Sequence, residues 1–231
     1  MPNCIVFDFD GVIVDSEPLH FRAFVRVGKP LGFELSWERY LDEFVGYDDR
    51  DAFRVMLGHE AGTTSPPEIE ARLPQLVQEK AQAFELEVNE GVDAIPGSLQ
   101  LIEQLAGQIP IAISSGATQL DIRIILAKLG LENVFHATVT ADDVQHSKPD
   151  PESYAKAVQL LAEKYPDHGI SPGTALAIED TATGIASARA AGLQVLGLTT
   201  TGPAELLHEA TRVVPNLAGV TFDTLRQWFV D

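Results

Sequence analysis

Residues 4–12 read CIVFDFDGV, an apolar run that leads into two aspartates, Asp8 and Asp10, and then a glycine. The run has the length and composition of a short buried strand. In an extended strand, side chains two residues apart point the same way, and two unit charges about 4 Å apart repel by about 4 kcal/mol at an effective dielectric near 20. Either one aspartate is protonated, or a cation lies between them, or the pair only caps a turn before Gly11.

The composition limits the class of protein. Of the 231 residues 45% are hydrophobic, enough for one large domain or for one domain with a smaller companion. The 34 acidic and 16 basic residues give a net charge of −18 without a basic patch, so we expect no nucleic-acid or membrane partner. The single cysteine, Cys4, fits a reducing compartment. No signal peptide or membrane span is visible, so the expected location is cytoplasmic.

Strand-like and helix-like segments alternate from about residue 91 onward. Strands are predicted at residues 109–114, 137–140, 174–179 and 193–198, and helices at residues 118–130, 150–165 and 183–192. This alternation predicts an α/β fold, a Rossmann-like parallel sheet with helices on both faces. The strand at residues 4–8 belongs to the same sheet.

Residues 17–90 interrupt the alternation, because their patterns are helical only. Helices are predicted at residues 36–46, 48–58 and 66–86, the last with a kink at Pro74. We therefore assign residues 1–16 and 91–231 to an α/β catalytic core domain and residues 17–90 to an inserted all-helical cap domain. An insertion after the first strand lies at the carboxyl edge of the sheet, where open α/β folds bind ligands.

The spacing of apolar residues also predicts which face of two helices is buried. In residues 36–46 the apolar stripe consists of Trp37, Tyr40, Leu41, Phe44 and Val45. In residues 118–130 it consists of Leu120, Ile124, Ala127 and either Ile125 or Leu129.

Two further predicted strands are followed by residues suited to an anion. Ser114, Ser115 and Gly116 come between a strand and a helix, where hydroxyls and free amides can bind a phosphate, although a serine N-cap is the ordinary alternative. Lys148 lies in HSKPDP, where two prolines stiffen the loop and can aim the ammonium inward. The alternative for Lys148 is a solvated surface lysine.

A third strand ends in a second acidic pair, Glu179 and Asp180. They could be a capping aspartate and a solvated glutamate. If they are ionised together with Asp8 and Asp10, however, the four carboxylates bring −4 and Lys148 returns +1. A divalent cation is the simplest resolution of such a cluster. Oxygen ligands without a Cys or His cluster favour Mg²⁺ over zinc.

The four stretches DFDGV, AISSG, SKPDP and IEDTATGIASARAAG, in this order, resemble the four motifs of the haloacid dehalogenase-like superfamily. The helical insertion resembles the small cap of that superfamily. The resemblance covers nearly the whole chain, and four ordered motifs are a highly specific signal. Within the superfamily, FDFDGVIVDSEPLHFRAF looks most like sugar-phosphate phosphatases and β-phosphoglucomutase. The resemblance implies a Mg²⁺-dependent phosphatase for a small phosphate ester, with a phosphosugar mutase as the alternative.

The resemblance also implies roles for the acidic residues. Asp8 would be the nucleophile that forms an aspartyl-phosphate. Asp10 would be the general acid for the leaving alkoxide and then the base for the attacking water. Mg²⁺ would be held by the Asp8 carboxylate, the Asp10 carbonyl oxygen and Asp180, with Glu179 bound directly or through water. True dehalogenases and phosphonate hydrolases lack the second aspartate, so Asp10 argues against both activities.

By the same resemblance, Ser114 and the amides of Ser115 and Gly116 would grip the phosphate, and Lys148 would neutralise it. The expected partner is therefore a small-molecule phosphate ester. The oligomeric state is left open, with a monomer favoured because the cap must move.

Four residues of the inserted segment are candidates to face the substrate: His20, Gly46, Arg50 and Lys80. The alternative for His20 is an imidazole on a helix surface. Arg50 could grip a second phosphate or a carboxylate, or it could pair with a neighbouring aspartate in the sequence. Lys80, in QEKAQ, is expected at the surface rather than in the site.

One position separates the two activities. The mutase that this chain resembles has a lysine before the glycine of the cap loop, where this chain has Val45. The missing cation favours a phosphatase. A receiver-like signalling module would also combine acidic residues, Mg²⁺ and a lysine, but such modules are about half this length and have no helical insertion.

Overall fold

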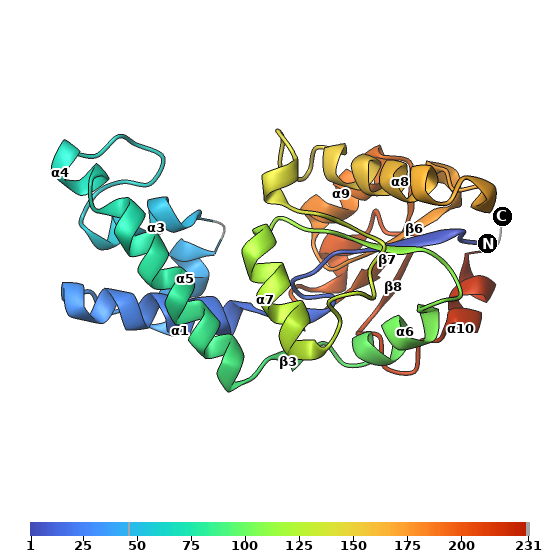
Figure 1. Cartoon of the computed structure of the whole chain (residues 1–231), viewed down its shortest axis with the longest axis horizontal. Helices are drawn as coiled ribbons and strands as arrows, with labels where there is room; N and C mark the ends of the chain where they lie inside the picture. Colours follow the sequence, from blue (N-terminus) through green and yellow to red (C-terminus); the bar gives the residue numbers. More distant parts are fainter. Residues whose placement is uncertain (46, 230–231) are drawn as a thin grey trace. The chain divides into compact units, whose positions relative to one another are not determined.

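The computed structural model describes residues 1–45 and 47–229. The chain forms two compact units. The α/β unit comprises Met1–Asp15 and Asp93–Asp231, and the helical unit comprises Ser16–Val92. Figure 1 shows the sheet of the α/β unit with its helices, and the helices that make up the helical unit.

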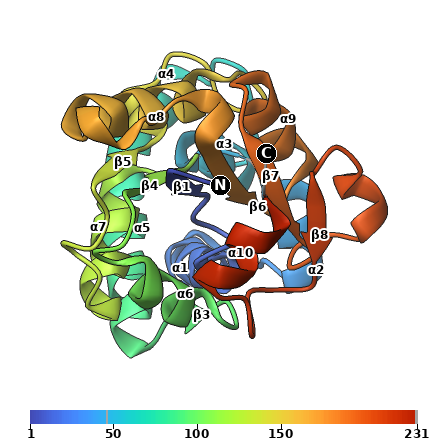
Figure 2. The same ribbon diagram turned by 90° about the vertical axis from the view of Figure 1, so that its right-hand side faces the viewer.

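Six parallel strands form the sheet of the α/β unit. They are β1 (Cys4–Phe7), β4 (Ile111–Ser114), β5 (Ala137–Val139), β6 (Ala175–Glu179), β7 (Gln194–Leu198) and β8 (Arg212–Val214). Their order in the sheet is β5-β4-β1-β6-β7-β8, and every neighbouring pair is parallel. Figure 2 shows the strands in this order. Two short strands, β2 (Val14–Asp15) and β3 (Asp93–Ala94), pair antiparallel where the chain passes between the units.

The central strands are apolar because both faces of the sheet are covered. β1, β4 and β6 are buried along their whole length. The register places Ile5 beside Ile111 on one side and Leu176 on the other. A parallel sheet covered on both faces requires such continuous apolar runs. The predicted parallel sheet is confirmed, and its carboxyl ends lie along one edge.

Helices cover both faces of this sheet, as predicted. They are α6 (Ser98–Leu105), α7 (Gln119–Leu129), α8 (Glu152–Lys164), α9 (Ala182–Ala190) and α10 (Phe222–Trp228), with short 3-10 turns η3 (Ala141–Asp143), η4 (Pro166–His168), η5 (Pro172–Thr174) and η6 (Ala204–Leu207). Tyr154 of α8 and Ile185 of α9 share one core cluster with Val6 of β1. Figure 2 shows α8 and α9 on one side of the sheet and α6 and α10 on the other.

The helical unit is built around an aromatic core. Its elements are α1 (Glu17–Gly28), η1 (Lys29–Leu31), α2 (Trp37–Arg39), η2 (Tyr40–Phe44), α3 (Asp49–Met56), α4 (Pro67–Glu70) and α5 (Leu73–Glu90). Phe24 of α1 contacts Tyr40, Phe44 and Phe53, with ring centroids 6.4, 6.4 and 5.6 Å away. No helix in the described parts of the chain is long and apolar enough to cross a membrane.

Residues 36–46 do not form the single α-helix that was predicted. After the short α2, the segment η2 is π-helical, and Val45 is extended. Tyr40 and Phe44 are buried, whereas Trp37 and Leu41 are exposed by 39% and 47%. The predicted stripe combined two neighbouring rows with a spacing of four residues, and only the row of Tyr40 and Phe44 faces the interior.

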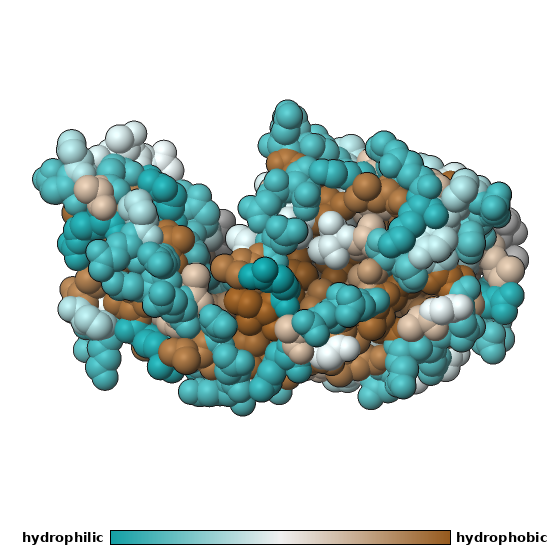
Figure 3. Space-filling view, in the orientation of Figure 1, coloured by the Kyte–Doolittle hydropathy of each residue, from teal (hydrophilic) through white to brown (hydrophobic). Residues whose placement is uncertain are grey.

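Two other helices also differ from their predictions. Residues 66–86 form the separate helices α4 and α5, and the break precedes Pro74, which lies in the first turn of α5, where its missing N–H costs nothing. The extent of α7 agrees with the prediction, and Ile125, one of the two alternatives for the stripe, is buried. The other buried residues, Ile122 and Leu126, were not predicted. Leu120 is 41% exposed, and Figure 3 shows hydrophobic surface over α7. Apolar residues occupy most of the circumference of α7, so periodicity alone could not identify the buried face.

Candidate active site

The carboxyl ends of β1 and β6 bring three acidic side chains together. Asp8 follows β1, and its backbone N–H donates to Ile178 O of the adjacent strand at 2.9 Å. Glu179 ends β6, and Asp180 follows it. Carboxylate oxygens of Asp8, Glu179 and Asp180 lie within 4.8 Å of one another, and all three residues are buried. Asp8 and the second acidic pair of the sequence therefore meet at one edge of the sheet.

Asp10 follows this cluster on the loop that leaves β1. It forms an isolated bridge with Val14, and Gly11 turns the chain with a φ of 73°. Asp10 is half-buried, and its charge helps to raise the pKa of both Asp8 and Asp180. The Asp10 carboxylate is therefore close enough to act on the cluster electrostatically.

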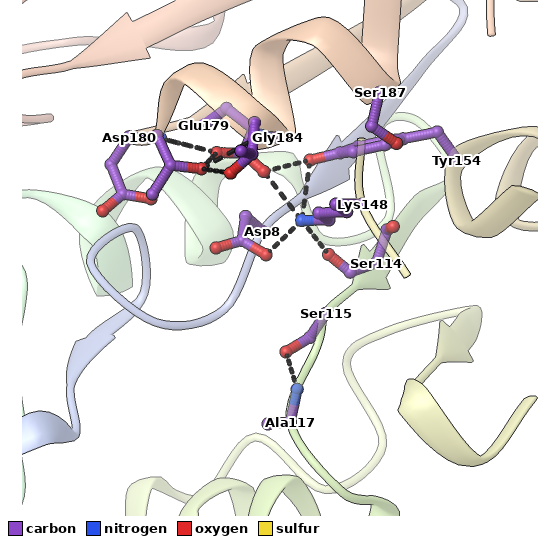
Figure 4. A network of polar contacts seen from close by, with 12 residues as sticks. Asp8, Ser114, Ser115, Ala117, Lys148, Tyr154, Glu179, Asp180, Gly184 and Ser187 are labelled. Atoms are coloured by element: carbon purple, nitrogen blue, oxygen red, sulfur yellow. Dashed lines mark hydrogen bonds and ion pairs between the residues drawn. The ribbon is translucent and has the colours of Figure 1, made fainter. Parts of the chain in front are cut away.

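Lys148 supplies the positive charge of the site (Figure 4). Its Nζ lies 2.6 Å from Asp8 Oδ1, 2.7 Å from Glu179 Oε1 and 3.1 Å from the carbonyl oxygen of Ser114. Burial by itself would lower the pKa of Lys148, but the charges of Asp8 and Glu179 outweigh it and raise that pKa. The ammonium therefore stays charged and faces inward, so Lys148 is not the solvated surface residue of the alternative interpretation.

The Glu179 carboxylate is saturated by protein donors. Oε1 accepts from Lys148 Nζ and from the Tyr154 hydroxyl, the latter at 3.1 Å. Oε2 accepts from the backbone N–H groups of Asp180 and Thr181, at 2.9 and 3.0 Å, and from the Thr181 hydroxyl at 3.0 Å. A carboxylate offers about four lone-pair sites. These contacts therefore leave Glu179 without a free site for direct metal coordination.

Asp180 differs from Glu179 in having one oxygen available. Its Oδ2 accepts from the Thr201 hydroxyl at 2.6 Å. Its Oδ1 is buried and has no hydrogen-bond partner among residues 1–45 and 47–229. Burial, followed by the charge of Glu179, raises the pKa of Asp180 to about 7. Such an orphaned oxygen costs free energy unless a proton or a cation satisfies it.

The electrostatics of Asp8 also indicate that the cluster needs a proton or a further cation. Burial raises the pKa of Asp8 well above its usual value, Lys148 opposes the rise, and the charges of Glu179, Asp180 and Asp10 add to it. One lysine thus does not balance the cluster. The oxygen donors and the orphaned Asp180 Oδ1 fit a hard divalent cation such as Mg²⁺.

The predicted phosphate-binding segment lies between β4 and α7, but it is not at the helix N-terminus. Thr118 is the N-cap of α7 and accepts from the backbone N–H of Asp121 at 3.2 Å. The Ser114 hydroxyl is buried and has no hydrogen-bond partner in the described part of the chain. The Ser115 hydroxyl accepts from Ala117 N–H at 2.9 Å and so shapes the loop at Gly116. The predicted phosphate-binding residues therefore lie ahead of the N-cap of α7, so the N–H groups of the first helical turn are not their neighbours in the sequence.

Buried Lys80 and half-buried His20 form a pair inside the helical unit. Lys80 is only 3% exposed, and its Nζ lies 2.9 Å from His20 Nδ1 and 3.0 Å from Asp49 Oδ1. His20 stacks on Phe84 with a centroid distance of 4.3 Å. Burial, and then the charge of Lys80, lower the pKa of His20 well below its usual value. The expectation of a surface lysine was wrong, because α1 and α3 provide polar partners that periodicity along α5 does not reveal.

Of the two remaining candidates in the inserted segment, the structure describes only Arg50, whose ion pair does not involve His20 or Lys80. Arg50 is exposed, and its Nη2 lies 3.7 Å from Glu70 rather than near the neighbouring aspartates in the sequence. Those aspartates are used elsewhere: Asp48 caps α3, and Asp51 pairs with Arg54 at 2.6 Å. Gly46 lies outside the described residues.

Sequence analysis did not identify three residues that shape the site: Tyr154, Gly184 and Thr201. Tyr154 lies on α8 and donates to Glu179, and an added Cβ on Gly184 would overlap the Glu179 carboxylate. Thr201 follows β7, which neighbours β6 in the sheet. The signal for Thr201 was the run TTT after a predicted strand, since it too lies at the carboxyl edge.

Residues 5–198 match the sequence profile of the haloacid dehalogenase-like hydrolases, and the chain belongs to this family. It is an enzyme of the branch that contains sugar-phosphate phosphatases and phosphomutases. Hexitol phosphatase A of Escherichia coli (strain K12) is 32% identical, over 94% of this chain and 92% of that one. β-Phosphoglucomutase of Bacillus subtilis (strain 168) is 25% identical, over 97% and 94%. The crystal structure of CbbY from Rhodobacter sphaeroides with phosphate has a TM-score of 0.77 and 24% identity, over 98% and 100%, which shows a shared fold.

Proposed function

We propose that this enzyme is a Mg²⁺-dependent phosphatase that hydrolyses a small phosphate ester, a sugar phosphate, through an aspartyl-phosphate. The observation that carries the proposal is the ion pair of buried Asp8 with half-buried Lys148, 2.6 Å apart, beside the unpartnered Oδ1 of Asp180. This arrangement combines a nucleophile, a fixed cation and a free oxygen ligand. Phosphoryl transfer needs mostly positioning and charge neutralisation.

Asp8 is the nucleophile in this proposal. Its carboxylate attacks phosphorus, an Asp8 oxygen–phosphorus bond forms, and the bond from phosphorus to the ester oxygen breaks. Lys148 favours the ionised form of Asp8 against the effect of burial, and it is positioned to neutralise the phosphate charge. A water then attacks phosphorus, releases inorganic phosphate and restores the carboxylate.

Asp10 transfers the protons. It donates a proton to the leaving alkoxide in the first step and accepts one from the attacking water in the second. Because Asp10 lies on the loop after β1 and is half-buried, it can exchange protons with solvent between the steps. The two aspartates of the FDFDG segment therefore divide the work of nucleophile and acid–base catalyst.

The residues for a cation and a phosphate lie around this pair. Mg²⁺ would be held by Asp8, the Asp10 carbonyl oxygen and Asp180, and when bound it would neutralise the negative charge of the phosphate. Since protein donors occupy both Glu179 oxygens, we assign Glu179 to fixing Lys148 and the Asp180 backbone rather than to holding the ion.

The phosphate donors are the buried Ser114 hydroxyl and the amides of Ser115 and Gly116. The Ser114 hydroxyl is available because no other described group binds it. Ser114 and Lys148 are held together by the bond from Nζ to the Ser114 carbonyl oxygen. The same lysine therefore links the phosphate-binding loop to the nucleophile.

We propose that the helical unit acts as a cap that excludes water and selects the substrate. His20 and Arg50 are its candidate substrate contacts, together with Gly46. Lys80 is assigned a different task, because it is buried against His20 and Asp49 and holds the imidazole in place.

The reaction is assigned to hydrolysis rather than transfer of the phosphate to a second position. Val45 is 45% exposed and offers no cation for a second phosphate, in contrast to the lysine of the mutases that the chain resembles. Hexitol phosphatase A, at 32% identity, is a phosphatase by name. The phosphosugar mutase is the second candidate, on the evidence of the relative named β-phosphoglucomutase.

The test is a panel of hexose, pentose and hexitol phosphates assayed for phosphate release with and without Mg²⁺. We expect release that depends on Mg²⁺, no turnover in Asp8→Asn, and a loss of about 10²–10⁴-fold in Asp10→Asn. Asp223→Asn, an exposed aspartate on α10, is the matched control and should keep full activity. Interconversion of glucose phosphate isomers without phosphate release would instead establish the mutase. Near-normal rates in Asp8→Asn would refute the assigned nucleophile.

A further inference from the structure

The loop after β7 reaches back to the acidic cluster through two threonines. Thr201 Oγ1 lies 2.6 Å from Asp180 Oδ2 and 3.2 Å from the Asp180 carbonyl oxygen. Thr200 Oγ1 donates to the carbonyl oxygen of Gly11 at 2.5 Å. The loop therefore contacts both the turn after the nucleophile and the residue after β6, although it comes late in the chain and carries no group that could act in the reaction.

The contact between Gly11 and Asp180 explains why the oxygen that Thr201 binds has a fixed position. Gly11 has a φ of 73°, and an added Cβ would overlap Asp180 Oδ2 and come within 2.9 Å of Thr201 Cγ2. Oδ2 is thus enclosed by the Gly11 turn on one side and by Thr201 on the other. The Thr201 hydrogen bond and the Gly11 turn therefore fix the plane of the Asp180 carboxylate, with one oxygen bound and the other available.

The other oxygen, Oδ1, is the one left for a ligand. It is buried and unpartnered within the described ranges, and the Asp180 carboxylate belongs to the same cluster as Asp8. Ligating carboxylates in metal sites are commonly hydrogen-bonded through the oxygen that does not bind the ion, and loss of such a partner lowers metal affinity. Thr201 is such a partner, because it donates to Asp180 Oδ2 and leaves Oδ1 available.

We propose that Thr201 is a positioning residue of the cation site, which binds Oδ2 of Asp180 and thereby presents Oδ1 to the ion. The inference rests on the proposed Mg²⁺-dependent function, and it assigns the orientation of the ligating carboxylate to a loop outside the four motifs. It concerns affinity for the ion and not the chemistry, because Thr201 does not touch the reacting atoms.

The experiment is titration of Mg²⁺ into the substrate-free protein, followed by calorimetry, for wild type, Thr201→Val, Thr201→Ser and Thr199→Val. Valine keeps the shape of threonine and removes the hydroxyl, which leaves the buried Asp180 Oδ2 without this donor. We expect Thr201→Val to raise the Mg²⁺ Kd by about 10–100-fold and Thr201→Ser to restore it to within about threefold of wild type. Thr199→Val, in the same loop, should leave the Kd unchanged.

The outcomes separate this inference from the proposed function. If wild type binds Mg²⁺ and Thr201→Val binds it equally well, Thr201 only ties down its loop and the inference is overturned, while the proposed function stands. The inference is also overturned, and the function again stands, if Thr201→Val weakens binding but serine does not restore it. If wild type binds no Mg²⁺, the metal-dependent function itself fails and the inference fails with it. Thermal unfolding without Mg²⁺ measures the effect of Thr201→Val on folding separately from its effect on the Mg²⁺ Kd.

Discussion

Gly184 lies against the carboxylate of Glu179 so closely that an added Cβ would overlap both carboxylate oxygens. Gly184 is in the first turn of α9, and its N–H donates to the hydroxyl of Thr181, the N-cap, at 3.1 Å. The helix therefore begins directly on the saturated carboxylate that fixes Lys148. This close approach is the reason for the glycine in the fourth motif, which has no need of a left-handed backbone here.

We predict that Gly184→Ala lowers both stability and activity. Alanine would favour the helix by about 1 kcal/mol, but overlap with a buried, fully bonded group costs typically about 1–3 kcal/mol. We expect the overlap to outweigh the gain in helix propensity. The alanine should displace Glu179 and reduce the rate of phosphate release at least about tenfold. The measurements are thermal unfolding and the activity panel.

Gly173→Ala is the matched control for that variant, since no described atom lies within 4 Å of a Cβ added there. It should leave the rate unchanged and alter Tm only slightly. A Gly184→Ala protein as stable and as active as wild type would show that Glu179 can shift without consequence.

A second prediction ranks two changes at the same carboxylate. Tyr154→Phe removes one neutral hydrogen bond to Glu179 Oε1 and keeps the ring, whose centroid lies 4.8 Å from Lys148 Nζ. Its cost should be about 1 kcal/mol. Glu179→Gln leaves Lys148 with less charge compensation in a buried site, which should cost about 3–5 kcal/mol. Equal effects of both variants in urea denaturation would contradict the view that the charge of Glu179 matters more than its hydrogen bonds.

The sequence predicted the parts of the site that depend on strand ends. Asp8, Ser114 and Asp180 each follow or end a short apolar run, and parallel strands bring such positions to one edge whatever their distance along the chain. Lys148 was harder, because a loop lysine is ordinarily solvated. Two features indicate an inward-facing lysine here: the prolines that stiffen the loop, and the resemblance of SKPDP to a motif of the family.

The sequence could not predict the features that depend on which other helix or strand packs against a residue. Lys80 lies in a polar stretch of α5, and its burial follows from Asp49 on α3 and His20 on α1. The run TTT places Thr201 just after a predicted strand, but only the pairing of β6 with β7 brings it to Asp180. Which of several apolar rows on a helix faces inward, as on α7, is likewise decided by the partner surface and not by the helix.

A third prediction concerns the helical unit at low pH. Glu87 of α5 is 3% exposed and accepts from Arg22 at 2.7 Å and Arg26 at 2.5 Å, both on α1. Burial alone would raise the pKa of Glu87, but the two arginines outweigh it and lower that pKa. Because the pKa of Glu87 is lower in the folded protein, its ionised form stabilises the fold at pH values above the pKa of glutamate in the unfolded chain, near 4.3. This stabilisation is lost as the pH falls through the pKa of Glu87 in the folded protein.

We therefore expect the free energy of unfolding to fall on acidification below about pH 4.3, and to fall less steeply in Glu87→Gln. Arg26→Gln should cost about 1 kcal/mol at pH 7 because the arginines are half exposed. Lys29→Gln changes a lysine that takes no part in the contacts of Glu87 with Arg22 and Arg26, so it is the control. Guanidinium denaturation at pH 7 and at about pH 3.5 measures the difference, and parallel pH profiles in wild type and Glu87→Gln would disprove the linkage.

The last prediction uses the lowered pKa of His20, which burial and then Lys80 impose. The folded protein keeps this imidazole neutral below the unfolded pKa near 6.5, whereas the unfolded chain takes up a proton there. Stability should therefore decrease as the pH falls from about 6.5 toward the folded pKa, because the unfolded state binds more protons in that window. Carbon-13 or nitrogen-15 NMR of the histidine rings should show His20 neutral at about pH 6.

The variants that isolate this effect change the cation and leave the imidazole in place. Lys80→Met removes the neighbouring charge and should raise the pKa of His20, while His208→Gln, on the surface, should leave it unchanged. A pKa of His20 near 6.5 in wild type would contradict the effect of burial. A pKa of His20 that did not change in Lys80→Met would contradict the effect of the neighbouring charge.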